Sequence, residues 1–387
     1  MDLEKYGITM WSEEKIKAFR KALLDWYDKN KRDLPWRKNT DPYAVWVSEI
    51  MLQQTRVDTV IPYFYRFMEQ LPTIQALAEA SEEVLLKVWE GLGYYTRVRN
   101  MQQAARQIME EYHGVFPTTY ETIIQLKGIG PYTAGAIASI SFGLPEPAVD
   151  GNLMRVLSRL FEIDYDIGNP SNRKIFQAVA EVLIDPKRPG DFNQALMDLG
   201  SDIESPVNPK PELSPVKDFS AAYLNGTMAR YPIKKPKKKP MLRHFRAFVI
   251  QNEKGEYLLE KNTTNLLQGF WSFPLIEDFS RMYEQPDLFM VAESSEEYVV
   301  PNMSIPLTTQ FESLYRQQVE WQAVLSGTVQ HIFSHQKWSI TLQTGRVQHE
   351  QLVIDKELAW VNPTDFIQYP FAKPQHKMIA LVLRGRE

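Results

Sequence analysis

The 387-residue chain contains no cysteine. This absence excludes disulfide bonds, zinc sites built on thiolates and iron–sulfur clusters ligated by cysteine. No apolar run reaches the length that spans a membrane, and the first residues lack the pattern of a signal peptide. We therefore expect a soluble, cytoplasmic protein that acts without a membrane.

The chain also lacks an excess of positive charge, since its formal net charge is −4 at pH 7. This value argues against a surface coated with cations, although a local basic cleft remains compatible with it. Hydrophobic residues make up 44% of the sequence, which is enough for packed cores. The length fits two or three domains.

The most informative stretch runs from Leu126 to Asn152. A helix predicted over Pro117–Lys127 stops at Gly128 and Gly130, where the missing Cβ atoms leave backbone amides open at a tight turn. Pro131 suits the first position of the next helix. Amides before a helix N-terminus attract an anion such as a DNA phosphate. Taken alone, these residues fit an ordinary helical hairpin at least as well.

Two carboxylates stand in settings that suit chemistry. Glu49 lies four residues after Val45 and three before Leu52, on the apolar face of a predicted helix. Apolar surroundings raise a carboxyl pKa, which suits a proton donor near neutral pH. The structural alternative is a partly buried glutamate paired with Arg56. Asp150 precedes another predicted helix, where aspartate is also a preferred N-cap.

The hairpin Leu126–Gly130, followed by Val149–Asn152, resembles the helix-hairpin-helix and acidic loop of base-excision DNA glycosylases. The segments SEIMLQQTR at 48–56 and GLGYYTRVRN at 91–100 closely resemble the adenine DNA glycosylase (MutY) family. The resemblance covers nearly the whole chain. It implies an all-α helix-hairpin-helix glycosylase domain followed by an α+β MutT/Nudix-like domain.

The resemblance also implies an activity, the release of adenine mispaired with 8-oxoguanine or guanine, which starts base excision repair. In this interpretation Glu49 protonates the adenine, Asp150 stabilises the sugar cation, and Tyr132 and Asn152 orient the pair and the water. Bifunctional relatives carry a nucleophilic lysine where this chain has Tyr132. We therefore expect a monofunctional glycosylase.

The DNA contacts that the resemblance implies come from several segments. The family wedges the opened duplex with residues matching Gln54 and Tyr94, and a packed tyrosine is the structural alternative for the latter. Arg37 belongs to a proline-interrupted segment near the base pocket, which a structural turn would also explain. The predicted DNA-binding residues are Gln54, Tyr94, Gly128, Gly130, Arg37 and Arg97.

The main departure from the family follows residue 200. Relatives carry four cysteines there, separated by six, two and five residues, which bind an iron–sulfur cluster. The positions at that spacing hold Glu204, Pro211, Ser214 and Ser220 in this chain. We therefore predict that the cluster is absent and that the protein uses neither a metal nor another cofactor. Prolines could stiffen the loop instead.

Three regions are expected along the chain: a catalytic domain over 1–225, a lysine-rich linker over 226–241 and the MutT/Nudix-like domain over 242–387. The last contains predicted strands at 245–251, 257–261, 329–334, 338–344 and 347–354, and a closing helix at 374–383. It lacks the acidic box of Nudix hydrolases after Gly269, so we expect binding without pyrophosphatase chemistry. In the resembled family, the loop that matches Phe333, Ser334 and His335 recognises the damaged base. The structural alternative is that the serine and histidine are ordinary surface residues of a loop.

The predicted partner is double-stranded DNA that contains an 8-oxoguanine:adenine or guanine:adenine mispair, and the predicted state is a monomer. Two other functions are compatible with parts of the sequence. One is a glycosylase with another base preference, such as mismatched thymine. The other is a lesion-binding protein that has lost catalysis together with the cluster, against which the intact Glu49, Tyr132, Asp150 and Asn152 argue.

Overall fold

The structure is a computed structural model, which describes residues 1–236, 240–264, 266–280, 305–324, 327–333, 335–348 and 356–384. The chain forms two compact units. The first comprises Met1–Ala80 and Thr96–Lys237, and the second comprises Ser81–Tyr95 and Lys238–Glu387. In the described ranges, every helix is too short or too polar to cross a bilayer.

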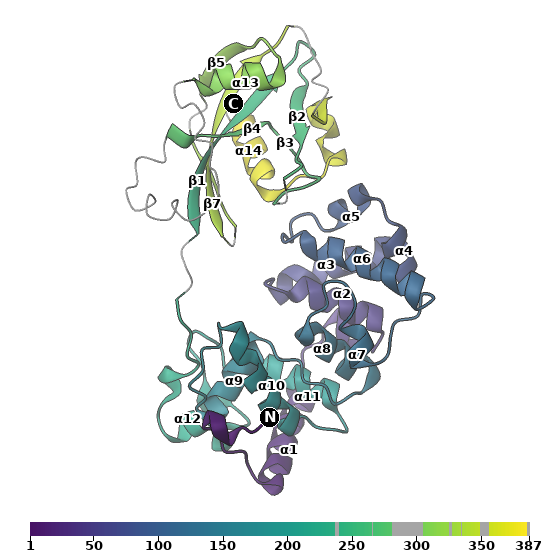
Figure 1. The fold of residues 1–387 in the computed structure, drawn as a ribbon, viewed down its shortest axis with the longest axis vertical. Coiled ribbons are helices and arrows are strands. Elements are labelled where there is room, and N and C mark those ends of the chain that lie inside the picture. The colour runs from purple at the N-terminus through teal and green to yellow at the C-terminus, as the bar shows by residue number, and fades with distance from the viewer. Residues whose placement is uncertain are drawn as a thin grey trace. The chain divides into compact units, whose positions relative to one another are not determined.

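The first unit is helical (Figure 1). Its α-helices are α1 (Glu13–Asn30), α2 (Pro42–Leu52), α3 (Val57–Gln70), α4 (Ile74–Glu79), α6 (Thr96–Glu111), α7 (Tyr120–Ile123), α8 (Pro131–Phe142), α9 (Gly151–Phe161), α10 (Arg173–Leu183), α11 (Pro189–Asp198) and α12 (Ala221–Leu224). Local signals set several ends: Ser12 accepts a hydrogen bond from the Lys15 amide at the start of α1, and Asp41 caps α2 ahead of Pro42.

Packing among these helices positions the candidate site. The helix α2 packs against α8, which also contacts α11, while α9 contacts both α10 and α11. A buried core that includes Phe19, Leu157 and Phe176 joins α1 with α9 and α10. The α2–α8–α11–α9 contacts bring Glu49, Tyr132 and Asp150 into one region of the unit.

The helix predicted over Pro117–Lys127 is largely wrong. The α-helical part spans four residues, Tyr120–Ile123, because Thr119 caps it late in the segment. The following residues then tighten into turns with three-residue spacing, such as the Leu126 amide donating to the Ile123 carbonyl at 3.2 Å. These turns lead to Gly128, whose φ of +78° ends the helical path.

The segment 226–235 is hydrogen-bonded to the helical unit. The Thr227 hydroxyl donates to Glu162, Arg230 pairs with Asp164 at 2.9 Å, and the Ile167 amide donates to the Ile233 carbonyl at 3.0 Å. Much of the stretch expected to be a linker therefore extends the first unit. Residues 237–239 lie outside the described part of the chain.

The second unit is built on a mixed sheet with the order β3-β2-β1-β7-β5, in which β4 also pairs with β1, β6 with β7, and β8 with β2. The central β1 and β7 are parallel, with Met241 opposite Gln336. Its described elements are α5 (Glu82–Val88), β1 (Met241–Gln251), β2 (Tyr257–Lys261), β3 (Trp271–Ser272), β4 (Leu275–Glu277), α13 (Leu307–Tyr315), β5 (Glu320–Val324), β6 (Val329–Ile332), β7 (Gln336–Arg346), β8 (Leu358–Val361) and α14 (Lys373–Arg384).

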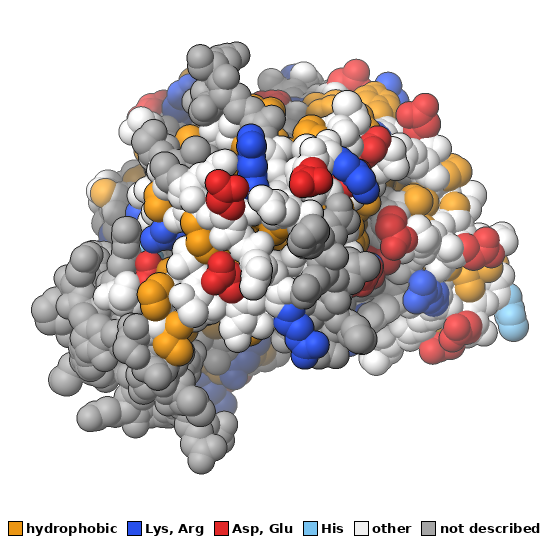
Figure 2. All heavy atoms as spheres, turned by 90° about the horizontal axis from the view of Figure 1, so that it is seen from above, with side chains coloured by type: hydrophobic (Ala, Val, Ile, Leu, Met, Phe, Trp, Pro, Cys, Tyr) orange, Lys and Arg blue, Asp and Glu red, His pale blue; other side chains and the backbone are white. Residues whose placement is uncertain are grey.

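The order of a helical unit followed by an α+β unit confirms the predicted fold class. The predicted strands at 245–251 and 257–261 and the closing helix are confirmed by β1, β2 and α14. The strand predicted over 347–354 is not formed at 347–348, and 349–355 lie outside the described residues. Figure 2 shows acidic and basic side chains interspersed on the face turned to the viewer, in keeping with the net charge of −4.

Candidate active site

Glu49 lies in α2, where every residue from Tyr43 to Met51 is buried, and 5% of its surface is exposed. Its carboxylate accepts a hydrogen bond from the Tyr132 hydroxyl, with 2.5 Å between the Tyr132 Oη and Glu49 Oε2. The sequence suggested Arg56 as the structural alternative, but the neutral Tyr132 is the partner that the structure gives.

The surroundings of Glu49 raise its pKa from 4.5 to about 7. Burial is the main cause, because a carboxylate loses hydration among apolar side chains, and the nearby charge of Asp150 acts in the same direction. The Tyr132 hydrogen bond and the Arg37 charge oppose this effect. At neutral pH, Glu49 therefore exists in both protonation states and can give or take a proton.

Asp150 caps α9 and keeps a second oxygen for other contacts. Its Oδ1 accepts from the Leu153 amide at 2.7 Å, and its Oδ2 accepts from the Asn152 side-chain amide at 2.9 Å. Burial raises the pKa of Asp150, while these hydrogen bonds and the Arg155 charge lower it. The capping role expected from the sequence is confirmed, and it fixes the orientation of the carboxylate.

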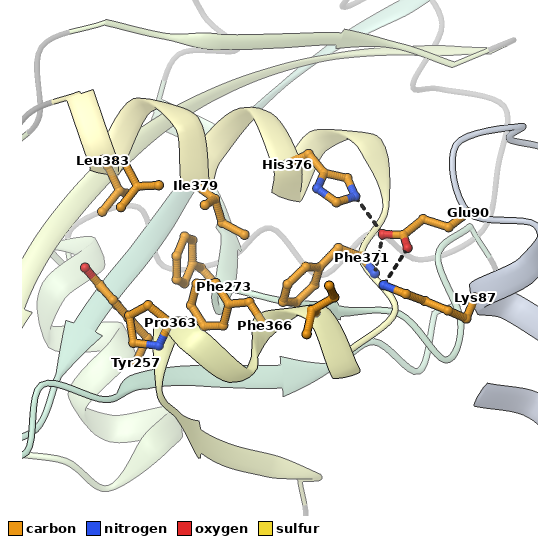
Figure 3. Close-up of a pocket in the computed structure, with 12 residues that line it drawn as sticks. Lys87, Glu90, Tyr257, Phe273, Pro363, Phe366, Phe371, His376, Ile379 and Leu383 are labelled. Carbon is orange, nitrogen blue, oxygen red and sulfur yellow. Dashed lines mark hydrogen bonds and ion pairs between the residues drawn. The ribbon is translucent and has the colours of Figure 1, made fainter. Parts of the chain in front are cut away.

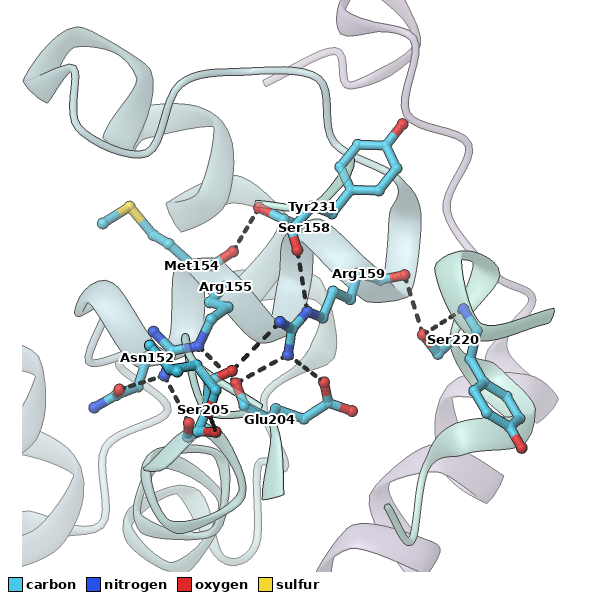
Figure 4. A network of polar contacts seen from close by, with 12 residues as sticks. Asn152, Met154, Arg155, Ser158, Arg159, Glu204, Ser205, Ser220 and Tyr231 are labelled. Carbon is cyan, nitrogen blue, oxygen red and sulfur yellow. Dashed lines mark hydrogen bonds and ion pairs between the residues drawn. The ribbon is translucent and has the colours of Figure 1, made fainter. Parts of the chain in front are cut away.

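Asn152 is in turn held by Arg155, one turn further along α9. The Arg155 Nη2 donates to Asn152 Oδ1 at 2.7 Å and to the Gly200 carbonyl at 2.6 Å (Figure 4). The Arg155 Nε donates to the backbone carbonyl of Glu204 at 2.6 Å. Sequence analysis missed Arg155, although its three-residue spacing from Asn152 on one helix favours this contact.

The hairpin turn before α8 is exposed at Gly128 and Gly130. A Cβ on Gly128 would lie 2.6 Å from the Asn100 Cβ, so both the positive φ and the close approach require glycine here. Gly130 is the N-cap residue of α8 and has open space around its Cα. The two glycines are exposed, whereas the Ile129 amide between them donates to the Leu126 carbonyl at 3.1 Å, and the phosphate contact stays a prediction.

The two predicted DNA-binding arginines are engaged inside the helical unit. Arg37 pairs with Asp198 at 2.7 Å and has 12% of its side chain exposed. Arg97 donates to the carbonyls of Ile50, at 2.7 Å, and Gln53, at 2.7 Å, and so caps the end of α2. Arg97 thus stabilises the end of α2, and Arg37 is held by Asp198 close enough for its charge to act on Glu49. Contact with DNA stays a prediction for each.

The two predicted wedge residues are exposed at turns. Gln54 and Tyr94 have φ angles of +59° and +49°, which is uncommon for residues other than glycine. Tyr94 has 44% of its surface exposed. Gln54 belongs to the first unit and Tyr94 to the second, and insertion into DNA stays a prediction for both.

The predicted lesion-reading loop joins β6 to β7, as the sequence indicates. Phe333 is half-buried between His331 and Trp338, with ring centroids 4.6 and 4.8 Å away. His335 is exposed, and Ser334 lies outside the described residues. Lesion recognition by this loop stays a prediction.

Two residues of the stretch NQALMDLG were missed in the sequence, because their roles depend on contacts with distant segments. The Met197 sulfur lies 3.8 Å from the Tyr132 hydroxyl. Asp198 is 1% exposed and pairs with both Arg32 and Arg37. Both residues lie at the C-terminal end of α11, where they contact Tyr132 and Arg37.

The second unit contains a separate, mainly apolar cavity of about 350 Å³ (Figure 3). Phe273, Phe366 and Phe371 are among its lining residues. At its mouth, Glu90 accepts from His376 at 2.7 Å and pairs with Lys87 at 2.8 Å. These polar groups satisfy one another, so the cavity offers packing surface and little chemistry.

The positions that match the cluster cysteines do not suit a metal. The Glu204 side chain is paired with Arg159 at 2.6 Å, and Pro211 has no donor atom in its side chain. The Ser220 hydroxyl accepts from the Tyr223 amide at 3.3 Å as the N-cap of α12. Within the described residues, no group of three or more acidic or histidine side chains could hold a metal ion.

Comparison with known proteins places this geometry in a family. Residues 47–183 match the HhH-GPD superfamily base excision DNA repair proteins, and residues 246–381 match the NUDIX domain. The chain is 31% identical over 428 residues to the adenine DNA glycosylase of Schizosaccharomyces pombe, across 94% of this chain and 88% of that protein. The chain belongs to the adenine DNA glycosylase family.

Other adenine DNA glycosylases are similar over shorter lengths. The human protein is 49% identical over 219 residues, which is 54% of this chain and 40% of the human one. The chain thus spans about 40–42% of the length of the mammalian relatives that it matches. A solved thermostable thymine-DNA glycosylase is 27% identical with a TM-score of 0.49, covering 55% of this chain and 98% of that one.

Within this family assignment, Glu49, Tyr132, Asp150 and Asn152 all fall in the stretch that matches the HhH-GPD proteins. Phe333 and His335 fall in the NUDIX match.

Proposed function

We propose that this chain is an adenine DNA glycosylase that hydrolyses the N-glycosidic bond of adenine mispaired with 8-oxoguanine or guanine in double-stranded DNA. The observation that carries the proposal is the buried Glu49, which has a pKa of about 7, contacts Tyr132 and lies near Asp150. Glycosidic cleavage needs a pair of carboxyl groups, and here one is half protonated near neutral pH while the second, nearby, is held in a fixed orientation.

The reaction begins with the adenine flipped out of the duplex, which costs roughly a few kcal/mol that contacts to DNA must offset. Glu49 donates its proton to N7 of the adenine. The C1′–N9 bond then breaks, and its electron pair leaves with the purine. The positive charge that develops on the sugar faces Asp150, which stabilises or briefly traps it.

Water completes the hydrolysis at C1′, and its proton passes to the ionised Glu49. Tyr132 holds the Glu49 carboxylate through its hydroxyl, and Asn152 holds Asp150 through its amide. Because Tyr132 carries no amine, a Schiff base with the sugar is not expected at this position, and strand cleavage should require added alkali.

Recognition of the opposite base is assigned to the β6–β7 loop. Phe333 and the exposed His335 supply an aromatic group and a hydrogen-bonding group two positions apart in the chain. 8-Oxoguanine differs from guanine by an oxygen at C8 and a hydrogen at N7, so a polar group in this loop would distinguish them. One neutral hydrogen bond gives about 0.5–1.5 kcal/mol, which corresponds to a several-fold preference.

The proposed enzyme is a monomer that works without an iron–sulfur cluster or another metal. The support is chemical, because the positions at the cluster spacing offer a carboxylate engaged with arginine, a proline and two serines. Elemental analysis of the purified protein should find no stoichiometric iron, and a chelator should leave the rate unchanged. Iron at cluster stoichiometry would contradict this part of the proposal.

Single-turnover assays on a panel of duplexes test the activity. Adenine opposite 8-oxoguanine should be released fastest and adenine opposite guanine more slowly, with thymine opposite guanine left intact. The salt concentration must be fixed, because phosphate contacts make affinity depend on it. Thymine release would favour a different base preference, and binding of the mispair without any base release would favour the non-catalytic alternative. The variant His335→Ala should narrow the difference between the two adenine substrates.

A further inference from the structure

The loop after α11 is held by a buried ion pair. Arg159 Nη1 and Glu204 Oε2 lie 2.6 Å apart, and each side chain is 4% exposed. Arg159 also donates to the Glu204 backbone carbonyl at 2.9 Å and to the Tyr231 carbonyl at 3.2 Å (Figure 4). A guanidinium with this many partners can be buried without leaving donors unsatisfied.

The Glu204 carbonyl has a second donor, the Arg155 Nε, at 2.6 Å. Arg155 and Arg159 are one helical turn apart on α9, so one carbonyl oxygen joins both guanidinium groups. Two cations at this spacing repel each other, and the Glu204 carboxylate is the acid paired with Arg159. The position of residue 204 therefore controls where Arg155 sits.

Arg155 carries this constraint to the reacting carboxylate. Its Nη2 holds the Asn152 oxygen, and the Asn152 amide holds Asp150 Oδ2 at 2.9 Å. The backbone after α11 also lies directly on Asn152, because a Cβ on Gly200 would be 2.8 Å from the Asn152 Cβ. Because of this close contact, a shift of the loop toward α9 would displace Asn152.

We infer that the Glu204–Arg159 ion pair is a positioning device for Asp150, acting through Arg155 and Asn152. It occupies the first of the four positions where the resembled family has cluster cysteines, and it fixes the loop with one carboxylate and one guanidinium. Glu204 and Arg159 are positioning residues, since neither contacts Asp150. The inference deepens the proposed function and rests on its assignment of Asp150 to the sugar cation.

The test compares Glu204→Gln with Glu162→Gln in the full chain. Glu162 accepts from Asn225 at 2.9 Å at the C-terminal end of α9, the end opposite Asp150, so Glu162→Gln serves as the control loss of a stabilising carboxylate. Two duplex probes are bound, one with a cationic pyrrolidine and one with a neutral tetrahydrofuran in place of the target sugar. A well-placed Asp150 should favour the cationic probe.

In Glu204→Gln, the preference for the cationic probe and the single-turnover rate should both fall about tenfold, the effect of losing one well-placed charged contact. Affinity for the neutral probe should stay within about twofold, because phosphate contacts dominate it. Glu162→Gln should lower the melting temperature and leave both the preference and the rate unchanged. A Glu204→Gln protein that keeps the full preference would overturn the inference.

If Glu204→Gln does not fold, the double variant Glu204→Leu/Arg159→Met removes both charges and avoids a lone buried cation. The inference predicts that this variant folds but loses the preference, because nothing then fixes residue 204. Full preference in the folded double variant would overturn it. A native chain that prefers the cationic probe but releases no adenine would contradict the proposed function and support the positioning of Asp150. A native chain without that preference would overturn the inference.

Discussion

Two buried glutamates in the helical unit differ in the group that faces each carboxylate. Glu49 is 5% exposed and faces the neutral hydroxyl of Tyr132, whereas Glu204 is 3% exposed and faces the guanidinium of Arg159. Burial is thus nearly the same for both. The neutral partner leaves Glu49 with a pKa of about 7, able to exchange a proton, while the cationic partner makes Glu204 part of a fixed ion pair.

At similar burial, the group that contacts the carboxylate decides whether a glutamate can serve in proton transfer or in a structural ion pair. It also assigns opposite consequences to the same chemical change at the two sites. Replacing either glutamate by glutamine removes one ionisable group, yet the expected results differ in kind.

The largest effect is expected for Glu49→Gln on catalysis. The single-turnover rate of adenine release should fall about 10²–10⁴-fold, because the amide cannot donate a proton to N7. Affinity for the uncleaved duplex should be retained. Glu69→Gln, on the exposed surface of α3, should behave like the native protein. A Glu49→Gln rate within a few-fold of native would remove Glu49 from the role of general acid.

The next largest effect is expected for Glu204→Gln on stability. The free energy of unfolding should fall by about 3 kcal/mol, since Arg159 stays buried without its anion. Urea denaturation at neutral pH measures the change. The double variant Glu204→Leu/Arg159→Met should recover most of the loss, and a double variant less stable than the single one would contradict the explanation.

The third prediction concerns the hydrogen bond that lowers the Glu49 pKa against the effect of burial. The Tyr132 hydroxyl lowers this pKa, so Tyr132→Phe should raise it further above 7. Glu49 would then stay protonated at higher pH. The basic limb of the rate profile should move upward by about one pH unit, the equivalent of a hydrogen bond to a charged group. Tyr65→Phe, an exposed position on α3, is the control that should leave the profile in place.

The smallest effect is the pH dependence of stability. The Glu49 pKa is raised from 4.5 to about 7 on folding, so between these values the folded state binds more protons than the unfolded one. The free energy of unfolding should therefore fall as pH rises through this window and level off above it. Glu49→Gln lacks this slope and should gain about 2–3 kcal/mol relative to the native chain between pH 5 and pH 8. If the free energy of unfolding changes by the same amount between pH 5 and pH 8 in both proteins, the burial argument is refuted.

Much of this comparison could be predicted from the sequence, and the reason is local. The apolar spacing around Glu49, the capping position of Asp150, and the Pro42 and Pro131 starts of α2 and α8 are set by residues within one or two turns. The strands β1 and β2 were predictable in the same way from short apolar runs on either side of a turn. Short-range rules cover such features.

The remaining features depend on contacts between distant segments. The Arg159–Glu204 pair joins residues 45 positions apart, and Arg37 pairs with Asp198 across 161 positions. A sequence pattern shows that each arginine is present but does not show that its guanidinium group is already engaged by other parts of the chain. This explains why Arg37 and Arg97 were predicted as DNA contacts and are found engaged within the protein. The short α7 likewise depends on which threonine caps it, and the structure places the cap at Thr119.

The grouping of Ser81–Tyr95 with the second unit has a consequence for how the protein is made and dissected. This segment carries Glu90, which binds His376, and Tyr95, whose ring centroid lies 4.1 Å from that of Phe270. On the ribosome it emerges well before the sheet that it packs against, so it must wait for most of the chain to be synthesised. The backbone crosses between the units at three places, after Ala80, after Tyr95 and after Lys237. A fragment that ends at Lys237 would keep α5 but lose the rest of the second unit, with which α5 is grouped. Its properties would therefore reflect an α5 without its partners as well as the loss of the sheet.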